Sequence, residues 1–134
     1  MHLDTDGINK LIAREGFKTK AYKDTKGIWT IGVGHTGPEV TSTLQWSSDQ
    51  VMIAFRHDVG WAEDAVNEIN TSLTQNQFNA LVSFVFNIGA SAFRKSTIRR
   101  KLVAGDIQGA GKEFDRWHIP KEIIGRRNSE RDQF

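Results

Sequence analysis

The sequence predicts an α+β fold, in which a short helix and a β-hairpin precede a larger helical part. Residues 4–16 repeat apolar side chains at helical spacing, and residues 20–35 are rich in β-branched and aromatic residues. The remainder carries repeated signals for helix starts and stops. The length of 134 residues suits one domain over residues 1–134, because such a chain buries roughly two-thirds of its unfolded surface.

The first helix is predicted between two local signals. Residues 4–6 (Asp-Thr-Asp) offer capping oxygens and negative charge at its N-terminus. The apolar residues that follow at spacings of three and four are Ile8, Leu11 and Ile12. Glu15 is the next position on the same stripe, and Gly16 is a plausible stop. A carboxylate therefore continues an apolar helix face.

Residues 20–35 predict a hairpin that turns at Lys26-Gly27. On the returning strand, alternation places Thr30 on the opposite face from Trp29 and Ile31. We therefore expect a small β lobe at about residues 16–45. The helical lobe is expected to comprise about residues 46–134 together with the N-terminal helix.

Two capping boxes introduce the longest predicted helices. Ser47 and Thr74 are each followed three residues later by glutamine, whose side chain can close the box. The helix that begins at Ser47 is expected over about residues 47–69. In the helix that follows Thr74, residues 78–88 are apolar almost all round, which predicts a buried central helix closed by Gly89.

Three shorter helices are expected in the C-terminal part. One covers residues 97–103 and is ended by Gly105, and another follows Asp106 and continues to about Trp117. Pro120 suits the first turn of a last helix. That last helix carries Arg126, Arg127, Glu130 and Arg131.

Composition and charge narrow the range of possible functions. The chain has no cysteine, which excludes disulfides, zinc–thiolate sites and a cysteine nucleophile. We expect no signal peptide and no transmembrane segment. The net charge is +2, but residues 1–93 hold 7 basic and 10 acidic side chains, whereas residues 94–134 hold 11 and 6. A basic C-terminal third suits an anionic surface such as bacterial wall, lipid or nucleic acid, or is only a solvated helical face.

Three side chains have the properties that glycoside hydrolysis requires. The reaction commonly uses one carboxyl group that holds a proton and another that stays ionised. Glu15, at the end of an apolar stripe, suits the first role, because apolar surroundings favour the protonated form. Asp24, in a polar loop, suits the second, although Asp is also common in turns. Thr30 could bind a water molecule through its hydroxyl, or serve strand formation alone.

The spacing of these three residues resembles that of the phage-type lysozymes. Glu15, eight residues, Asp24, five residues and Thr30 reproduce the Glu-x8-Asp-x5-Thr arrangement of that family. The resemblance covers nearly the whole chain. It extends to the segments 14–16, 21–24, 27–35, 73–84, 87–89 and 125–131.

The resemblance implies a lysozyme-like fold and a muramidase that needs no metal and no cofactor. Such an enzyme hydrolyses the β-1,4 bond between N-acetylmuramic acid and N-acetylglucosamine. Glu15 would protonate the glycosidic oxygen, while Asp24 and Thr30 would orient a water that attacks the opposite face. That attack inverts the anomeric carbon and needs the two carboxyl groups ~6.5–9.5 Å apart. Phe86 and Ser96 match positions that line the cleft and contact substrate.

His35 follows Gly32-Val33-Gly34 and could suggest catalysis or a metal site. Since no second histidine stands at ligand spacing, a structural hydrogen bond or salt bridge is the preferred interpretation, and no metal site is expected. The resemblance also implies phage or prophage-encoded lysis of a bacterial host. A monomer is expected that stays in the host cytoplasm until release, then acts on the wall from the periplasm or from outside.

Four other functions remain open from the sequence. A non-catalytic wall-binding module would not need a matched acid and water-orienting pair. A nucleic-acid-binding protein would use the basic C-terminal third, but no recognition helix is evident and no nucleic-acid partner is expected. Membrane disruption by the basic helices predicts killing that survives loss of Glu15. A lytic transglycosylase would use one Glu and no water, which Asp24 and Thr30 disfavour.

Overall fold

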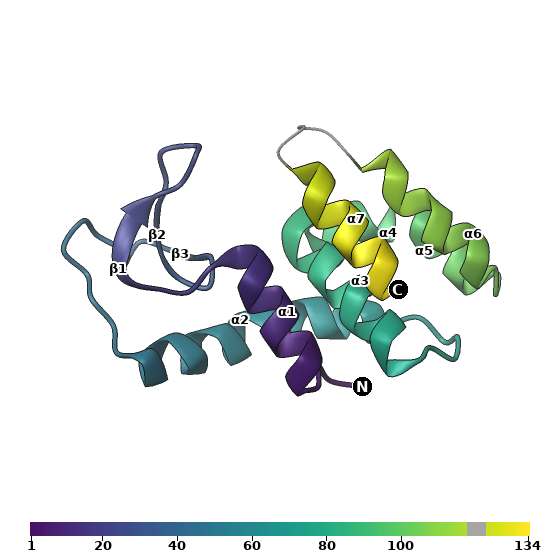
Figure 1. The fold of residues 1–134 in the computed structure, drawn as a ribbon, viewed down its shortest axis with the longest axis horizontal. Helices are drawn as coiled ribbons and strands as arrows, with labels where there is room; N and C mark the ends of the chain where they lie inside the picture. Colours follow the sequence, from purple (N-terminus) through teal and green to yellow (C-terminus); the bar gives the residue numbers. More distant parts are fainter. Residues whose placement is uncertain (118–122) are drawn as a thin grey trace. The chain divides into compact units, whose positions relative to one another are not determined.

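The computed structural model describes residues 1–117 and 123–134, and it confirms the α+β fold (Figure 1). Contacts within the chain divide it into two compact units. One unit comprises residues 9–60, and the other comprises residues 1–8 with residues 61–134. Among the described residues, no helix is both long and apolar enough to cross a membrane.

The unit of residues 9–60 contains the sheet. Its helices are most of α1 (Thr5–Glu15) and the first part of α2 (Ser48–Asn67). Between them lie β1 (Lys18–Lys23), β2 (Trp29–Gly32) and β3 (His35–Thr36). The predicted first helix, the hairpin and the helix that follows Ser47 are all present. The two-residue strand β3 was not predicted, because so short a strand carries no alternation.

The sheet is antiparallel, with the strand order β1-β2-β3. In β1 and β2, Tyr22 pairs with Thr30 and Lys23 pairs with Trp29. The register shifts between Lys18 and Tyr22, which marks a β-bulge or irregularity in β1. Paired residues present their side chains on the same face, so Tyr22 and Thr30 lie on one face and Lys23 and Trp29 lie on the other.

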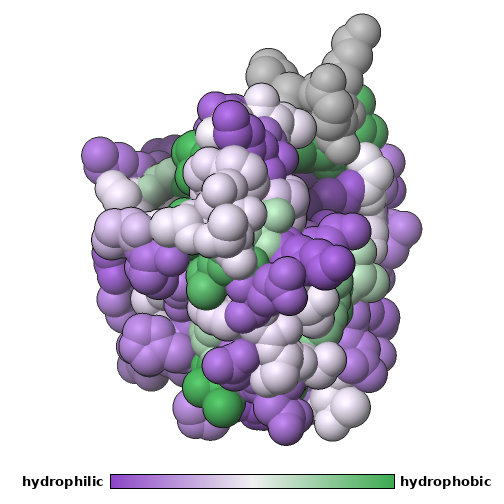
Figure 2. Space-filling view, turned by 90° about the vertical axis from the view of Figure 1, so that its left-hand side faces the viewer, coloured by the Kyte–Doolittle hydropathy of each residue, from purple (hydrophilic) through white to green (hydrophobic). Residues whose placement is uncertain are grey.

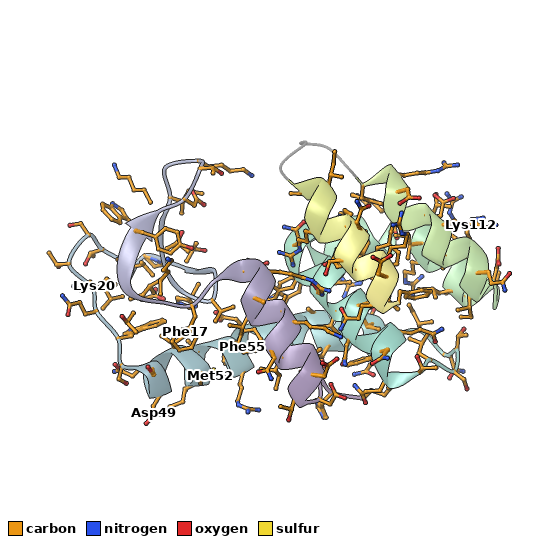
Figure 3. The ribbon with its side chains drawn as sticks, in the orientation of Figure 1. Phe17, Lys20, Asp49, Met52, Phe55 and Lys112 are labelled. Carbon is orange, nitrogen blue, oxygen red and sulfur yellow. The ribbon has the colours of Figure 1, made fainter. Side chains whose placement is uncertain are left out.

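Apolar side chains from α1, the sheet and α2 form the core of this unit. Phe55 is buried on α2, and Figure 3 shows it one turn along that helix from Met52. The other fully or nearly buried members are Leu11, Ile31, Val33, Val40, Val51 and Val59. Because Leu11 is completely buried, the last turns of α1 are anchored in the interior.

Helix α3 (Gln75–Ile88) is the buried helix of the other unit. Thr74 Oγ1 accepts from the Gln77 backbone, and the Gln77 side chain accepts from the Thr74 backbone, so the predicted capping box is confirmed. Every residue of the run 78–85 is buried. Gly89 ends the helix with a φ of +94°, which only glycine adopts without strain.

Shorter helices follow α3. They are α4 (Ala90–Arg94), α5 (Thr97–Val103), α6 (Ile107–Glu113), a 3₁₀ turn (Phe114–Arg116) and α7 (Ile124–Gln133). Helix α5 has its predicted bounds, whereas α6 tightens into the 3₁₀ turn before Trp117. Helix α4 was not predicted, because five residues after a glycine give no periodic signal. Pro120 lies outside the described residues.

Two helices of this unit are joined by a buried polar network. Arg127 and Glu130 of α7 are both completely buried, and Nη1 of Arg127 donates to Oε1 of Glu130 at 2.6 Å. Ser83 of α3 donates to Oε2 of Glu130 at 2.5 Å, and Arg126 donates to the Ser83 carbonyl at 2.8 Å. Arg127 also donates to Asn87. The network therefore fixes α7 on α3.

On the face shown in Figure 2, hydrophilic residues predominate and hydrophobic residues form small separate areas. Among the described residues, the large apolar side chains that are exposed are Met1, Phe17, Ile28, Ile53, Trp61 and Val103. Single exposed apolar residues are ordinary on soluble surfaces and need no partner.

Candidate active site

Glu15 is the last residue of α1 and is half-buried. The backbone N–H of Gly16 donates to the Ile12 carbonyl at 2.7 Å, and Gly16 then adopts a φ of +89°. The helix thus stops abruptly after Glu15, and the chain turns toward β1. Since Leu11 is anchored in the core one turn earlier, the position of the Glu15 carboxyl group is set by a rigid element.

Asp24 closes the hairpin loop between β1 and β2. Its Oδ1 accepts hydrogen bonds from the backbone N–H of Lys26 at 2.8 Å and of Ile28 at 2.9 Å. Gly27 completes the loop with a φ of +78°, a left-handed conformation that favours glycine. Asp24 is therefore a turn residue, and both of these bonds fall on the same carboxylate oxygen.

Thr30 lies in β2 and is 3% exposed. Its Oγ1 donates a hydrogen bond to the Ile28 carbonyl at 2.9 Å. The hydroxyl proton is thereby committed to the loop, while the oxygen keeps lone pairs that can accept a hydrogen bond. Its register pairing with Tyr22 places it on the same face of the hairpin as that phenol.

Tyr22 is the residue of β1 that pairs with Thr30. Tyr22 and Thr30 thus lie on one face of the hairpin, with Asp24 at its loop end. Burial raises the pKa of the Tyr22 phenol above its ordinary value of 10.0, and the negative charges of Glu15 and then Asp24 raise that pKa further. Sequence analysis missed Tyr22, although its position two residues before Asp24 was a usable signal.

Phe86 and Ser96 belong to the other unit. Phe86, half-buried on α3, stacks on Trp61 with ring centroids 5.8 Å apart. Ser96 is the N-cap of α5: its Oγ accepts from the Arg99 backbone at 3.1 Å and donates to the Phe93 carbonyl at 2.7 Å. Its structural role is therefore clear from local bonds alone.

Ser96 also lines a polar pocket of about 340 Å³. The other lining residues are Lys95, Thr97, Glu113, Arg116 and Trp117. Within it, Arg116 pairs with Glu113 at 2.9 Å. Charged groups of both signs, two hydroxyls and an indole surround this pocket, so its lining offers both polar and apolar contacts.

His35 makes the structural contacts expected of it. Its Nδ1 lies 2.5 Å from Oδ2 of Asp58, and its Nε2 lies 2.6 Å from Oε1 of Glu39. The ring also contacts Trp46, with centroids 5.2 Å apart. In the part of the chain that the structure describes, no group of three or more His, Cys, Asp or Glu side chains could hold a metal ion. The salt-bridge interpretation of His35 is confirmed.

Comparison with known proteins identifies a family. Residues 13–130 match the family described as Phage lysozyme. The endolysin of Salmonella phage P22 is 38% identical, in an alignment that covers all of this chain and 98% of that protein. The endolysin of Bacillus phage B103 is 37% identical over all of this chain, which spans 54% of that protein's length.

Solved structures agree with the sequence comparison. The muramidase domain of SpmX from Asticaccaulis excentricus aligns with a TM-score of 0.90 and 32% identity, covering 99% of this chain and 97% of that one. The crystal structure of a mutant P22 lysozyme aligns with a TM-score of 0.88 and 38% identity, covering 100% of this chain and 98% of that one. The predicted lysozyme-like fold is confirmed.

Proposed function

This chain belongs to the phage lysozyme family, and from that premise we propose that Glu15 is the general acid of an inverting hydrolysis in which Asp24 and Thr30 hold the attacking water. The chain is an enzyme of the lysozyme class that hydrolyses bacterial peptidoglycan. The observation that carries the proposed roles is the placement of Asp24 and Thr30 in one hairpin, where both bond to the backbone of Ile28, directly after the helix that ends at Glu15.

The proposed reaction cuts the β-1,4 bond between N-acetylmuramic acid and N-acetylglucosamine. Glu15 gives its proton to the glycosidic oxygen as the bond from that oxygen to C1 of the muramic acid breaks. A water molecule attacks C1 from the opposite face and passes a proton to Asp24. The products are a new muramic acid end with inverted configuration and a free hydroxyl on the glucosamine.

The hairpin supports the assignments of Asp24 and Thr30. The two loop hydrogen bonds hold Oδ1 of Asp24, so the second carboxylate oxygen is engaged by neither of them and is available to a water. Thr30, whose proton is given to the Ile28 carbonyl, can only accept from that water. One acceptor on each side would fix the water with its oxygen lone pair directed at the sugar.

The remaining proposals concern binding and biology. Phe86 and Ser96 contact the sugar chain, and the basic residues after Arg94 contact the anionic wall surface. The enzyme is a monomer that needs no cofactor and has no nucleic-acid partner. It stays in the host cytoplasm until release, then acts on the wall of the lysed cell.

Substitution of each carboxyl group by its amide tests the mechanism. Glu15→Gln removes the proton donor, and we expect wall hydrolysis to fall by about 10²–10⁴-fold. Asp24→Asn keeps an Oδ1 that can accept both loop hydrogen bonds, so the loop is preserved while the negative charge is lost. A comparable loss of rate is expected, without a change in the free energy of unfolding beyond about 1 kcal/mol.

The control is Asp49→Asn, which neutralises an exposed carboxylate in the first turn of α2 (Figure 3). Products from purified peptidoglycan are identified by mass spectrometry, and proton NMR of fresh products gives the anomeric configuration. Equal wall clearing by wild type and Glu15→Gln would contradict the proposal and favour membrane disruption. An anhydro-muramic product would indicate a transglycosylase, and retained configuration would contradict direct attack by water.

A further inference from the structure

We propose that a pocket between α2 and β3 binds an N-acetylated sugar of the peptidoglycan glycan chain, as a second site apart from the candidate active site. The pocket has a volume of about 400 Å³, which falls in the range of small-molecule sites. All of its lining residues belong to the unit of residues 9–60. The inference rests on the proposed function for the identity of the ligand, because it gives the pocket a further length of the same substrate.

One face of α2 forms the wall of the pocket. Its side chains recur at spacings of three and four residues, which places them on one stripe of the helix. They are Gln50, Ile53, Ala54, His57 and Asp58. Another stripe of the same helix is buried in the core through Val51, Phe55 and Val59. The wall of the pocket is therefore carried by an anchored helix.

Trp46 and His35 close the pocket beside α2. The Trp46 N–H donates to the Thr19 carbonyl at 2.8 Å, and the indole contacts the His35 ring, with centroids 5.2 Å apart. His35 is itself held at both ring nitrogens, by Asp58 at 2.5 Å and by Glu39 at 2.6 Å. Because these groups are fixed before a ligand arrives, binding would cost little free energy for ordering them.

The strand register separates this pocket from the candidate active site. His35 pairs with Ile31 across β2 and β3, so the two residues lie on one face of the sheet. Thr30 is the neighbour of Ile31 in β2 and therefore faces the opposite side, together with its partner Tyr22. The pocket does not share a sheet face with the proposed water-binding hydroxyl.

The wall of the pocket suits a sugar ring, which has an apolar face of C–H groups and polar groups at its edge. Trp46, Ile53 and Ala54 supply the apolar surface. Oδ2 of Asp58 is bonded to His35, whereas Oδ1 can accept from a sugar hydroxyl. Oε1 of Gln50 accepts from the Ser47 backbone, so the amide N–H groups of Gln50 are not used by that cap and can donate.

The charges around the pocket favour a neutral occupant. Protonated His35 lies between the carboxylates of Asp58 and Glu39, so charges of both signs are already paired with one another. A charged ligand would have to compete with these pairs, whereas an N-acetylated sugar brings hydroxyl and amide groups without charge. N-acetylglucosamine, every second sugar of the glycan chain, is such a ligand.

A second contact with the substrate would keep the enzyme on the wall between cuts. Two weak contacts with one polymer bind more tightly than either alone, because the second contact forms within the complex already made by the first. Loss of the pocket should therefore slow the hydrolysis of whole peptidoglycan, while the rate on short soluble glycan strands stays unchanged.

Binding is measured by NMR in the Glu15→Gln background, which suppresses hydrolysis of the ligand. The probe is the β-1,4-linked tetrasaccharide of N-acetylglucosamine. The chain has four tryptophans, and comparison with Trp46→Phe identifies the indole N–H signal of Trp46. We expect this signal to shift on titration, with a Kd on the order of 1 mM, as for a weak single contact.

Ile53→Gln is the decisive variant, because Ile53 is 70% exposed in the wall of the pocket and its replacement should leave the fold intact. It should weaken binding at Trp46 by about fivefold or more, through lost apolar contact. The rate on whole peptidoglycan should fall by a similar factor. The matched control is Val103→Gln, on α5, where an exposed apolar side chain outside the pocket is changed in the same way. It should alter neither binding nor rate, and urea unfolding checks the fold of both variants.

A Trp46 signal that does not move with the sugar would overturn the inference, as would equal titration curves with and without Ile53→Gln. So would dimers in sedimentation experiments that Ile53→Gln abolishes, because a second copy of the chain would then occupy the pocket. If Trp46 titrates as expected but the wild-type chain does not hydrolyse peptidoglycan, the proposed function fails and the glycan site stands.

Discussion

Removal of the buried guanidinium of Arg127 should destabilise the protein far more than removal of an exposed one from the same helix. Arg127 is completely buried, donates to Glu130 at 2.6 Å and to Asn87, and its guanidinium carbon lies 4.9 Å from the centroid of the Phe84 ring. Arg127→Met keeps much of the apolar stem but leaves Glu130 with fewer donors. Breaking a buried ion pair in this way costs about 3–5 kcal/mol.

The structure places the cost at the lower end of that range. Glu130 keeps two other donors, Ser83 at 2.5 Å and Arg126 at 3.2 Å, so its charge is not left alone. We therefore expect the free energy of unfolding to fall by about 3 kcal/mol, which for a chain of this size lowers the Tm by roughly 10 °C.

The matched control is Arg131→Met, one turn further along α7. Arg131 pairs with the exposed Asp115 at 2.7 Å, and such surface pairs contribute about 0–1 kcal/mol. Urea unfolding followed by circular dichroism measures both variants. Losses that agree within about 0.5 kcal/mol would refute the distinction between buried and exposed pairs. A double variant, Arg127→Met with Glu130→Leu, should lose less than the sum of its single variants.

Two further predictions concern pH and backbone packing. Burial alone lowers the pKa of His35, but hydrogen bonds with Glu39 and Asp58 outweigh it, so the pKa lies above the ordinary 6.5. The stabilisation is therefore complete below about pH 6.5 and is lost as the pH rises through the raised pKa. Asp58→Asn should unfold at a lower urea concentration than wild type at about pH 6, and this difference should shrink by about pH 9. A difference that stays constant with pH would contradict the stabilising role of protonated His35. In α1, a Cβ on Gly7 would lie 2.5 Å from Cγ of Asn79, whose amide is already held by Asp4 and Gln75. Gly7→Ala should lower the free energy of unfolding by about 1–3 kcal/mol, whereas Gly60→Ala, with open space at its Cβ in α2, should raise it by up to about 1 kcal/mol. Thermal unfolding of both variants checks the pair, and similar Tm shifts would show that the Asn79 side chain gives way.

Local signals in the sequence predicted most of the fold. The capping boxes at Ser47 and Thr74 formed as expected, because cap and partner lie within one helical turn. Helix α6 was predicted too long, since nothing in its sequence shows that it tightens at Phe114. The short helix α4 was missed for the lack of any repeat.

The candidate site was predictable only in part. Spacing suggested Glu15, Asp24 and Thr30, but spacing carries no information about which atoms of a side chain are already in use. The two loop bonds to Oδ1 of Asp24 and the bond from Thr30 to the Ile28 carbonyl required coordinates. The residue opposite Thr30 could not be predicted, because regular pairing counted from Lys18 with Gly32 would set Tyr22 opposite Ile28 instead of Thr30.

The irregular stretch of β1 joins two parts of the chain that are fixed separately. Beside the loop, β1 is held to β2 by the pairs Tyr22 with Thr30 and Lys23 with Trp29. At its other end, β1 begins at Lys18, directly after the turn that follows the last residue of α1, Glu15. The irregular stretch after Lys18 lies between these two anchors. That stretch is held by a second partner, because the Ala21 N–H donates to the Leu44 carbonyl at 3.1 Å and the Trp46 N–H donates to the Thr19 carbonyl at 2.8 Å. A residue inserted between Lys18 and Tyr22 would therefore break these bonds and lengthen the eight-residue separation of Glu15 and Asp24, so the hairpin and the candidate site both depend on one length of β1.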